Sequence, residues 1–186
     1  MPFNDDVHLA QKFVGLRDKY GIKNVIETGT YHGNTTEWLA QNFENVFTCE
    51  SNSDYHAIAK KALEAFPNVT QKLQDSRVFL EATLPTLDGP TIVFLDAHWY
   101  DNPLLGEIVA IGRYGKRPIL AIHDFKVPEH PELGYDTYPG IVYEWAYIKA
   151  AVEEAYGANR YRIEYNQQAT GSMRGCIFIF PSELSE

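Results

Sequence analysis

The stretch "NVIETGTYHGNTTEWLA" (residues 24–40) predicts a buried strand that runs through a glycine-containing turn into a helix. The apolar run ends at Glu27, and Gly29 and Gly33 bracket three bulky residues. The polar residues 34–36 carry side chains that can cap the helix. Chains that turn in this way often lie beside nucleotide-like ligands, so the stretch raises the question of which ligand it holds.

Short β-branched runs alternate with longer segments of helical period along the rest of the chain. Strands are expected at 24–28, 45–50, 69–74, 91–98 and 117–124, and helices at 5–20, 34–42, 53–66, 76–84, 102–115 and 141–157. The last two β-rich runs, 160–166 and 175–181, are expected to pair as an antiparallel hairpin. The order predicts an α/β fold, namely a Rossmann-like, doubly wound, mostly parallel seven-stranded sheet with a C-terminal antiparallel β-hairpin.

Composition and charge restrict the class of protein. The 186 residues are 45% hydrophobic and 22% charged, which is typical of one globular domain. A net charge of −9 repels phosphate, so neither nucleic acid nor an anionic membrane surface is expected as a partner. No window approaches the ~20 apolar residues of a membrane span, and the N-terminus lacks the pattern of a secretion signal. Both cysteines lie in apolar runs, which favours a reducing, cytoplasmic location.

Polar side chains at the ends of the first three strands indicate the ligand. Position 31 is Tyr, so the turn lacks the G-x-G-x-x-G pattern that holds a pyrophosphate, and Glu27 suits a cationic group. After the second strand, Glu50 can accept hydrogen bonds from both hydroxyls of a ribose. After the third strand, Asp75 or Ser76 can meet an adenine amino group. The alternative is that these side chains are solvated or cap helices. Together they favour a nucleoside with a positively charged tail and no phosphate.

The motifs "VIETGTYHGNTT", "CES", "QDS" and "IVFLDAHW" resemble those of class I S-adenosylmethionine-dependent methyltransferases. The resemblance covers about residues 24–125 and includes the terminal hairpin. It implies that S-adenosylmethionine is the cofactor and that its methionine portion is held by Glu27, Gly29, Thr30 and Gly33. It also implies that Glu50 holds the ribose and that Asp75 and Ser76 lie near the adenine. We also expect Asp96 to bind the cofactor.

Three more polar side chains end the fourth and fifth strands. Asp96 ends the fourth strand, and His123 and Asp124 end the fifth. Because neighbouring parallel strands end at the same rim, these side chains can form an open metal site that suits Mg²⁺ or Mn²⁺. Such an ion would lower the pKa of a substrate hydroxyl and orient its oxygen toward the methyl group. The alternative is that Asp124 caps the next loop and that His123 is a core histidine.

This arrangement resembles metal-dependent small-molecule O-methyltransferases, both the catechol type and the macrocin or cephalosporin-modifying type. The resemblance implies an Asp after strand four and an acidic or amide pair after strand five. His123 takes the place of the first member of that pair, which favours Mn²⁺, Fe²⁺ or Zn²⁺ over Mg²⁺. No lysine lies between residues 73 and 115 to serve as the catechol-type base. The expected catalytic set is therefore Asp96, His98, Tyr100 and His123, with His98 preferred as the base because of its ordinary pKa.

The segment 125–140 is rich in aromatic and acidic side chains and is expected to form an acceptor loop with a hinge at Gly134. The single domain (1–186) then consists of an N-terminal helix (1–23), a cofactor-binding core (24–124), the acceptor loop (125–140), and a helix with the terminal hairpin (141–186). We expect methyl transfer to a hydroxyl of a sugar, a polyketide or a phenol, and a homodimer is compatible with the sequence.

Two other functions stay open. One is a catalytically silent module that binds S-adenosylmethionine. The other is a nicotinamide-dependent oxidoreductase, against which the missing third glycine counts.

Overall fold

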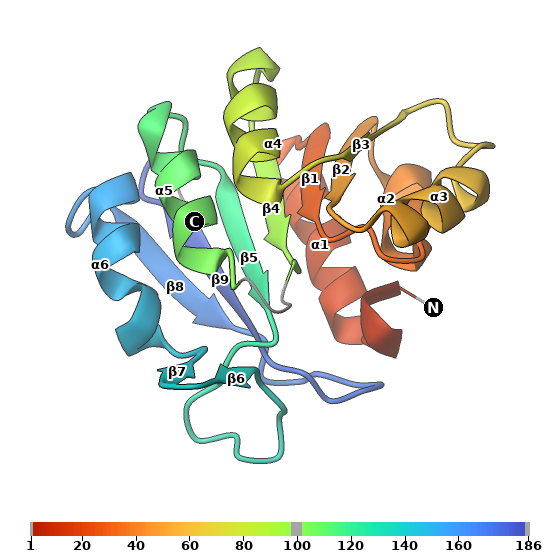
Figure 1. Ribbon diagram of the computed structural model, residues 1–186. Helices are drawn as coiled ribbons and strands as arrows, with labels where there is room; N and C mark the ends of the chain where they lie inside the picture. The colour runs from red at the N-terminus through yellow and green to blue at the C-terminus, as the bar shows by residue number, and fades with distance from the viewer. Residues whose placement is uncertain (1, 98–101, 185–186) are drawn as a thin grey trace.

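A computed structural model describes residues 2–97 and 102–184. Seven strands form one sheet: β1 (Asn24–Thr28), β2 (Asn45–Glu50), β3 (Val69–Leu73), β4 (Thr91–Leu95), β5 (Ile119–His123), β8 (Tyr161–Tyr165) and β9 (Cys176–Pro181). Their order is β3-β2-β1-β4-β5-β9-β8 (Figure 1). The first five strands pair in parallel, while β9 runs antiparallel to both β5 and β8. The predicted doubly wound sheet with its terminal hairpin is confirmed.

Helices cover both faces of the sheet (Figure 1). They are α1 (Val7–Tyr20), α2 (Asn34–Asn42), α3 (Ser53–Ala62), α4 (Ser76–Thr83), α5 (Leu104–Arg113) and α6 (Trp145–Tyr156), with short 3₁₀ turns η1 (Pro2–Asp5) and η2 (Leu84–Thr86). One apolar cluster joins α1 and α2 to the sheet, and a second joins α4, α5 and α6 to its other face. The strands β1, β4 and β5 are buried along their whole length, and burial on both faces explains why β4 and β5 are almost wholly apolar.

The strand order reverses at β1, which lies between β2 and β4. The chain continues from β1 toward β2 and β3, and later returns to β4 on the other side. Thr28 pairs with Cys49 on one side and with Leu95 on the other. The residues that follow these three therefore leave the sheet at the same level, where parallel sheets of this kind bind their ligands.

Three local expectations are corrected. The 125–140 loop ends in a small separate sheet of β6 (Thr137–Tyr138) and β7 (Ile141–Val142), so the helix predicted from 141 begins at Trp145. The β-branched pair Ile141 and Val142 explains the difference, because such residues favour a strand. The strand predicted over 91–98 ends at Leu95.

The third correction concerns the start of α2. The N-cap is Gly33, with no side-chain hydrogen bond, so the polar residues 34–36 do not cap the helix. The hydroxyl of Thr36 is directed to Glu27 instead, and that of Thr35 accepts a hydrogen bond from the backbone N–H of Phe3. Among the residues that the structure describes, no helix has the length and apolar character needed to cross a membrane.

Candidate functional site

The glycine turn after β1 packs directly against the end of β4. Gly29 has a left-handed backbone (φ 85°), and a Cβ atom built on it would lie only 2.7 Å from the carbonyl oxygen of Asp96. The backbone N–H groups of Gly29 and Thr30 both donate to the carbonyl of Cys49 at 3.0 Å. Both the backbone conformation and the close approach therefore require glycine here. Gly33 is also left-handed (φ 86°), but a Cβ there would make only ordinary contacts with α3 and Leu63.

Glu50 lies at the end of β2 and faces the turn. Its carboxylate accepts hydrogen bonds from the backbone N–H groups of Tyr31 and Asn52, each at 2.9 Å. The Tyr31 ring stacks on His32, with 3.9 Å between the ring centroids, and meets Tyr55 edge-on. Two backbone donors thus fix the carboxylate at the strand end, beside a group of aromatic rings.

Glu27 is almost wholly buried at the end of β1, with 1% of its surface exposed. It accepts hydrogen bonds from the hydroxyls of Thr36 and Thr48. Burial raises the pKa of Glu27 to about 8, which outweighs the opposite effect of the two hydroxyls, and the charges of Asp96 and Glu50 add to the rise. The three carboxylates at the ends of β1, β2 and β4 are thus close enough to interact electrostatically. A contact between Glu27 and the methionine portion of a cofactor stays a prediction.

Asp75 and Ser76 begin α4. The Asp75 side chain caps this helix by accepting from the backbone N–H of Arg77, and it also forms an ion pair with the Arg77 side chain. Ser76 is buried and hydrogen-bonds to Glu107 on α5, which also bonds to Thr28. The Asp75 side chain therefore has a structural role, and a contact of either residue with adenine stays a prediction.

Glu107 was missed by sequence reasoning. Its side chain is 1% exposed, and its Oε1 atom has no hydrogen-bond partner among the described residues. Burial raises its pKa to about 7. The sequence does contain a signal of a buried carboxyl group, because Glu107 interrupts the apolar face that Leu104, Ile108 and Ile111 form on α5.

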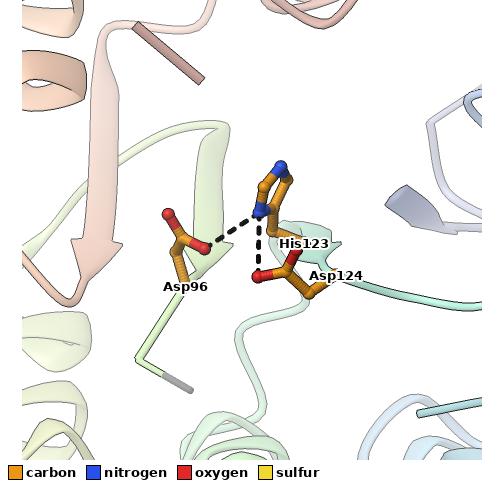
Figure 2. Close-up of side chains that lie close together, drawn as sticks. All are labelled: Asp96, His123 and Asp124. Carbon is orange, nitrogen blue, oxygen red and sulfur yellow. Dashed lines mark ion pairs between the residues drawn. The ribbon is translucent and has the colours of Figure 1, made fainter. Parts of the chain in front are cut away.

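Asp96, His123 and Asp124 converge at the ends of β4 and β5, and one ligand atom from each lies within 4.8 Å of the others. Figure 2 shows one ring nitrogen of His123 facing both carboxylates and the other pointing away. The facing atom, Nδ1, lies 3.1 Å from Oδ1 of Asp96 and 3.3 Å from Oδ2 of Asp124. Neither ring nitrogen makes a well-aligned hydrogen bond within the described part of the chain.

The imidazole of His123 is 1% exposed and packs edge-on against Phe94. Burial by itself lowers the pKa of His123, but the carboxylates of Asp96 and Asp124 outweigh it and raise the pKa well above its ordinary value. In the absence of a metal, the space between the two carboxylates therefore favours a positive charge.

The other two predicted catalytic residues, His98 and Tyr100, lie outside the described residues. Asn102, directly after them, accepts a hydrogen bond from the hydroxyl of Tyr143 at 2.5 Å and donates one to the hydroxyl of Tyr147 at 3.2 Å. Tyr143 is fully buried, and these hydrogen bonds fix the return of the chain into α5.

A second residue missed from the sequence is Arg174, in the turn before β9. Its guanidinium group donates to the carboxylates of Asp124 and Asp136. No local pattern indicated this contact, because Arg174 is 50 residues from Asp124 along the chain.

No protein-family model matches the sequence, and no curated protein does. Solved structures do match in fold. An O-methyltransferase from Bacillus cereus in complex with S-adenosylhomocysteine (SAH) aligns with a TM-score of 0.64 and 21% identity, over 97% of this chain and 84% of that chain. A SAM-dependent methyltransferase from Aquifex aeolicus aligns with a TM-score of 0.62 and 18% identity, over 94% and 88%.

EvdMO1 aligns with a TM-score of 0.59 and 19% identity over 94% of this chain, which spans only 40% of the length of EvdMO1. Its N-terminal domain is known with SAH bound. At these identities the likeness concerns the fold, and the chain has the class I methyltransferase fold.

Proposed function

We propose that this chain transfers a methyl group from S-adenosylmethionine to a hydroxyl oxygen of a small-molecule acceptor, with a divalent metal ion held by Asp96, His123 and Asp124. The observation that carries the proposal is the position of this cluster. It lies at the ends of β4 and β5, and the backbone of Asp96 contacts the glycine turn of β1. A methyl donor in the crevice and an activated hydroxyl at the cluster would therefore be neighbours.

The crevice supports a sulfonium nucleoside as its ligand. Glu50 is held at the end of β2, where its carboxylate can exchange the backbone donors Tyr31 and Asn52 for ribose hydroxyls. The carboxylate of Glu50 gives this rim a negative character, which suits a positively charged donor and disfavours a pyrophosphate. Similar folds from Bacillus cereus and EvdMO1 have been seen with SAH bound.

The residues present fit a divalent metal. Two carboxylates and one imidazole supply hard oxygen donors and one nitrogen donor, a set that suits Mn²⁺, and Mg²⁺ less well. The Nδ1 atom of His123 is buried, lies within reach of both carboxylates, and has no aligned hydrogen bond. Such an ion, when bound, would act as a Lewis acid and lower the pKa of the acceptor hydroxyl.

The side chains of the protein position the reactants and move the proton. Asp96 and Asp124 orient the acceptor oxygen at the rim, and the glycine turn brings the donor close to it. His98, two residues after Asp96, is the proposed base for the hydroxyl proton. The proposed acceptor carries a sugar, polyketide or phenolic hydroxyl, because the segment after β5 presents aromatic and acidic side chains such as Tyr135 and Asp136.

Calorimetric titration of SAH into the protein, first with a chelator and then with Mn²⁺, tests the proposal. We expect micromolar SAH binding under both conditions and a separate heat of Mn²⁺ binding. SAH binding without any turnover over a panel of hydroxyl acceptors in Mn²⁺ would favour the silent module. Absence of SAH binding would refute the methyltransferase proposal, and nicotinamide cofactors would then be titrated.

A further inference from the structure

Arg174 connects the proposed metal site to the acceptor loop. Its Nε atom donates to Oδ1 of Asp124, and its Nη2 atom donates to Oδ1 of Asp136. All three side chains are largely buried, with exposed fractions of 28% for Arg174, 16% for Asp124 and 25% for Asp136. Ion pairs that are shielded from water in this way hold their partners more firmly than surface pairs do.

The backbone around Arg174 forms a continuous set of hydrogen bonds with the same two segments. Gly134 N–H donates to the carbonyl of Met173 at 2.7 Å, and Gly175 N–H donates to the carbonyl of Gly134 at 2.9 Å. Asp136 N–H donates to the carbonyl of Asp124 at 2.8 Å. The residues after β5, the acceptor loop and the turn before β9 are therefore joined into one unit.

Gly134, which the sequence suggested as a hinge, lies directly against Arg174. Its backbone is not left-handed, and a Cβ atom built on it would lie 2.9 Å from Nη1 of Arg174. The glycine makes room for the guanidinium group to cross the loop. Gly175 is more tightly restricted, because a Cβ there would lie 2.2 Å from the backbone carbonyl oxygen of Phe125.

The two oxygens of Asp124 face different partners. Oδ1 accepts from Arg174, whereas Oδ2 lies 3.3 Å from Nδ1 of His123, on the side of the proposed metal. Asp124 also has a left-handed backbone, with φ 54°, which is uncommon for a residue other than glycine. Such a conformation persists only when its surroundings hold it in place.

The net charge of the metal site together with Arg174 and Asp136 also suits a divalent cation. Asp96, Asp124 and Asp136 together with Arg174 carry a formal charge of −2 when the imidazole is neutral, which matches one divalent cation. Without the guanidinium group, the carboxylates of Asp124 and Asp136 would lose a shared partner.

We propose that Arg174 is a positioning residue: it orients Asp124 so that only Oδ2 faces the metal, and it fixes the acceptor loop against the metal site. This inference rests on the proposed metal-assisted function. Arg174 is therefore expected to affect metal affinity mainly by orienting Asp124, and less through its own positive charge. The two effects have opposite signs, because removing a positive charge would by itself strengthen the binding of a cation.

The test is calorimetric titration of Mn²⁺ into the wild type and into the Arg174→Met and Arg174→Lys variants. Partners that orient metal ligands typically affect affinity 10- to 100-fold, so Arg174→Met is expected to weaken Mn²⁺ binding at least about tenfold. Arg174→Lys keeps the charge but lacks the planar fork that reaches both carboxylates, and it should weaken binding as well. Arg160→Met is the matched control, because Arg160 is exposed and pairs with Glu183.

Amide hydrogen exchange on the metal-free proteins gives a second readout. Arg174→Met should speed exchange at Gly134 and Asp136, while Arg160→Met should not. Mn²⁺ binding that is unchanged or tighter in Arg174→Met would overturn the inference and leave the proposed function intact. A wild type that binds SAH but no Mn²⁺ would refute the metal-assisted function, and the positioning role would fall with it.

Discussion

Nδ1 of His123 lies 3.1 Å from Oδ1 of Asp96, although 27 residues separate them and each ends a different strand. The pairing of β4 with β5 produces this contact, because Leu95 and Ile122 are partners in the parallel register. The next residues, Asp96 directly after β4 and His123 at the end of β5, therefore lie side by side. The proposed chemistry depends on this relationship, since it joins an imidazole from one strand to a carboxylate from the other.

Removing the Asp96 carboxylate should greatly weaken metal binding, with a smaller loss of cofactor affinity from the contact expected of Asp96 there. Asp96→Asn is expected to weaken Mn²⁺ binding about 100-fold or more, because it removes a charged ligand from a site with three donors among the residues that the structure describes. Titration of Mn²⁺ and of SAH measures both effects. Asp88→Asn, at an exposed position before β4, is the control. Equal Mn²⁺ affinity in Asp96→Asn would exclude this residue as a ligand.

Glu50 should contribute to cofactor affinity through the ribose. Hydrogen bonds to a charged group contribute about 1.5–3 kcal/mol, so Glu50→Gln is expected to weaken SAH binding about 10- to 100-fold. Glu44→Gln, on an exposed ion pair with Lys23, should have no effect. If both variants bind SAH as the wild type does, the ribose is held elsewhere.

Glu27 should make stability depend on pH. Its pKa is about 8 in the folded protein and near 4.5 in the unfolded chain, so the folded state retains a proton that the unfolded state has released. The free energy of unfolding should therefore decrease as the pH rises from about 4.5 to about 8. The slope is up to about 1.4 kcal/mol per pH unit for one such group.

Urea unfolding at a series of pH values measures this slope. Glu27→Gln should make it shallower, and Glu37→Gln, exposed on α2, should leave it unchanged. Glu107 should add a similar dependence that ends near pH 7. A slope that is the same in Glu27→Gln and in the wild type would show that Glu27 is not protonated in the fold.

Gly29 should tolerate no side chain, whereas Gly89 should tolerate one at modest cost. Both have left-handed backbones, with φ of 85° and 81°, so alanine costs about 1–2 kcal/mol at either position. At Gly29 the new Cβ would also meet the carbonyl oxygen of Asp96, whereas at Gly89 nothing lies within 4 Å. Such a clash adds about 1–3 kcal/mol.

Thermal or urea unfolding of the two alanine variants compares these costs directly. Gly29→Ala should also lose SAH affinity, because the turn would have to move away from β4. Equal destabilisation of the two variants would mean that the close approach at Gly29 has no energetic importance.

The fold could be predicted from the sequence because its signals are local. Strands such as β4 are short apolar runs, and helices such as α5 carry a period of their own, seen in the apolar face that contains Leu104. The convergence of Asp96 with His123 and Asp124 could also be predicted, since it follows from strand ends in a parallel sheet.

What could not be predicted depends on contacts between distant segments. The guanidinium group of Arg174 reaches Asp124 and Asp136 only because the turn before β9 folds back over the acceptor loop. The burial of Glu27 is also non-local, since Thr48 on β2 supplies one of its donors. The predicted start of α6 was wrong because two β-branched residues, Ile141 and Val142, pair with a segment inside the loop.

The central claim is tested most directly by a crystal structure of the protein with SAH and Mn²⁺, using the anomalous signal of manganese to locate the ion. We expect SAH to lie along the ends of β1 and β2 with its ribose on Glu50. We also expect one manganese peak at coordinating distance from oxygens of Asp96 and Asp124 and from a nitrogen of His123. A manganese peak elsewhere, or SAH bound away from the glycine turn, would contradict it.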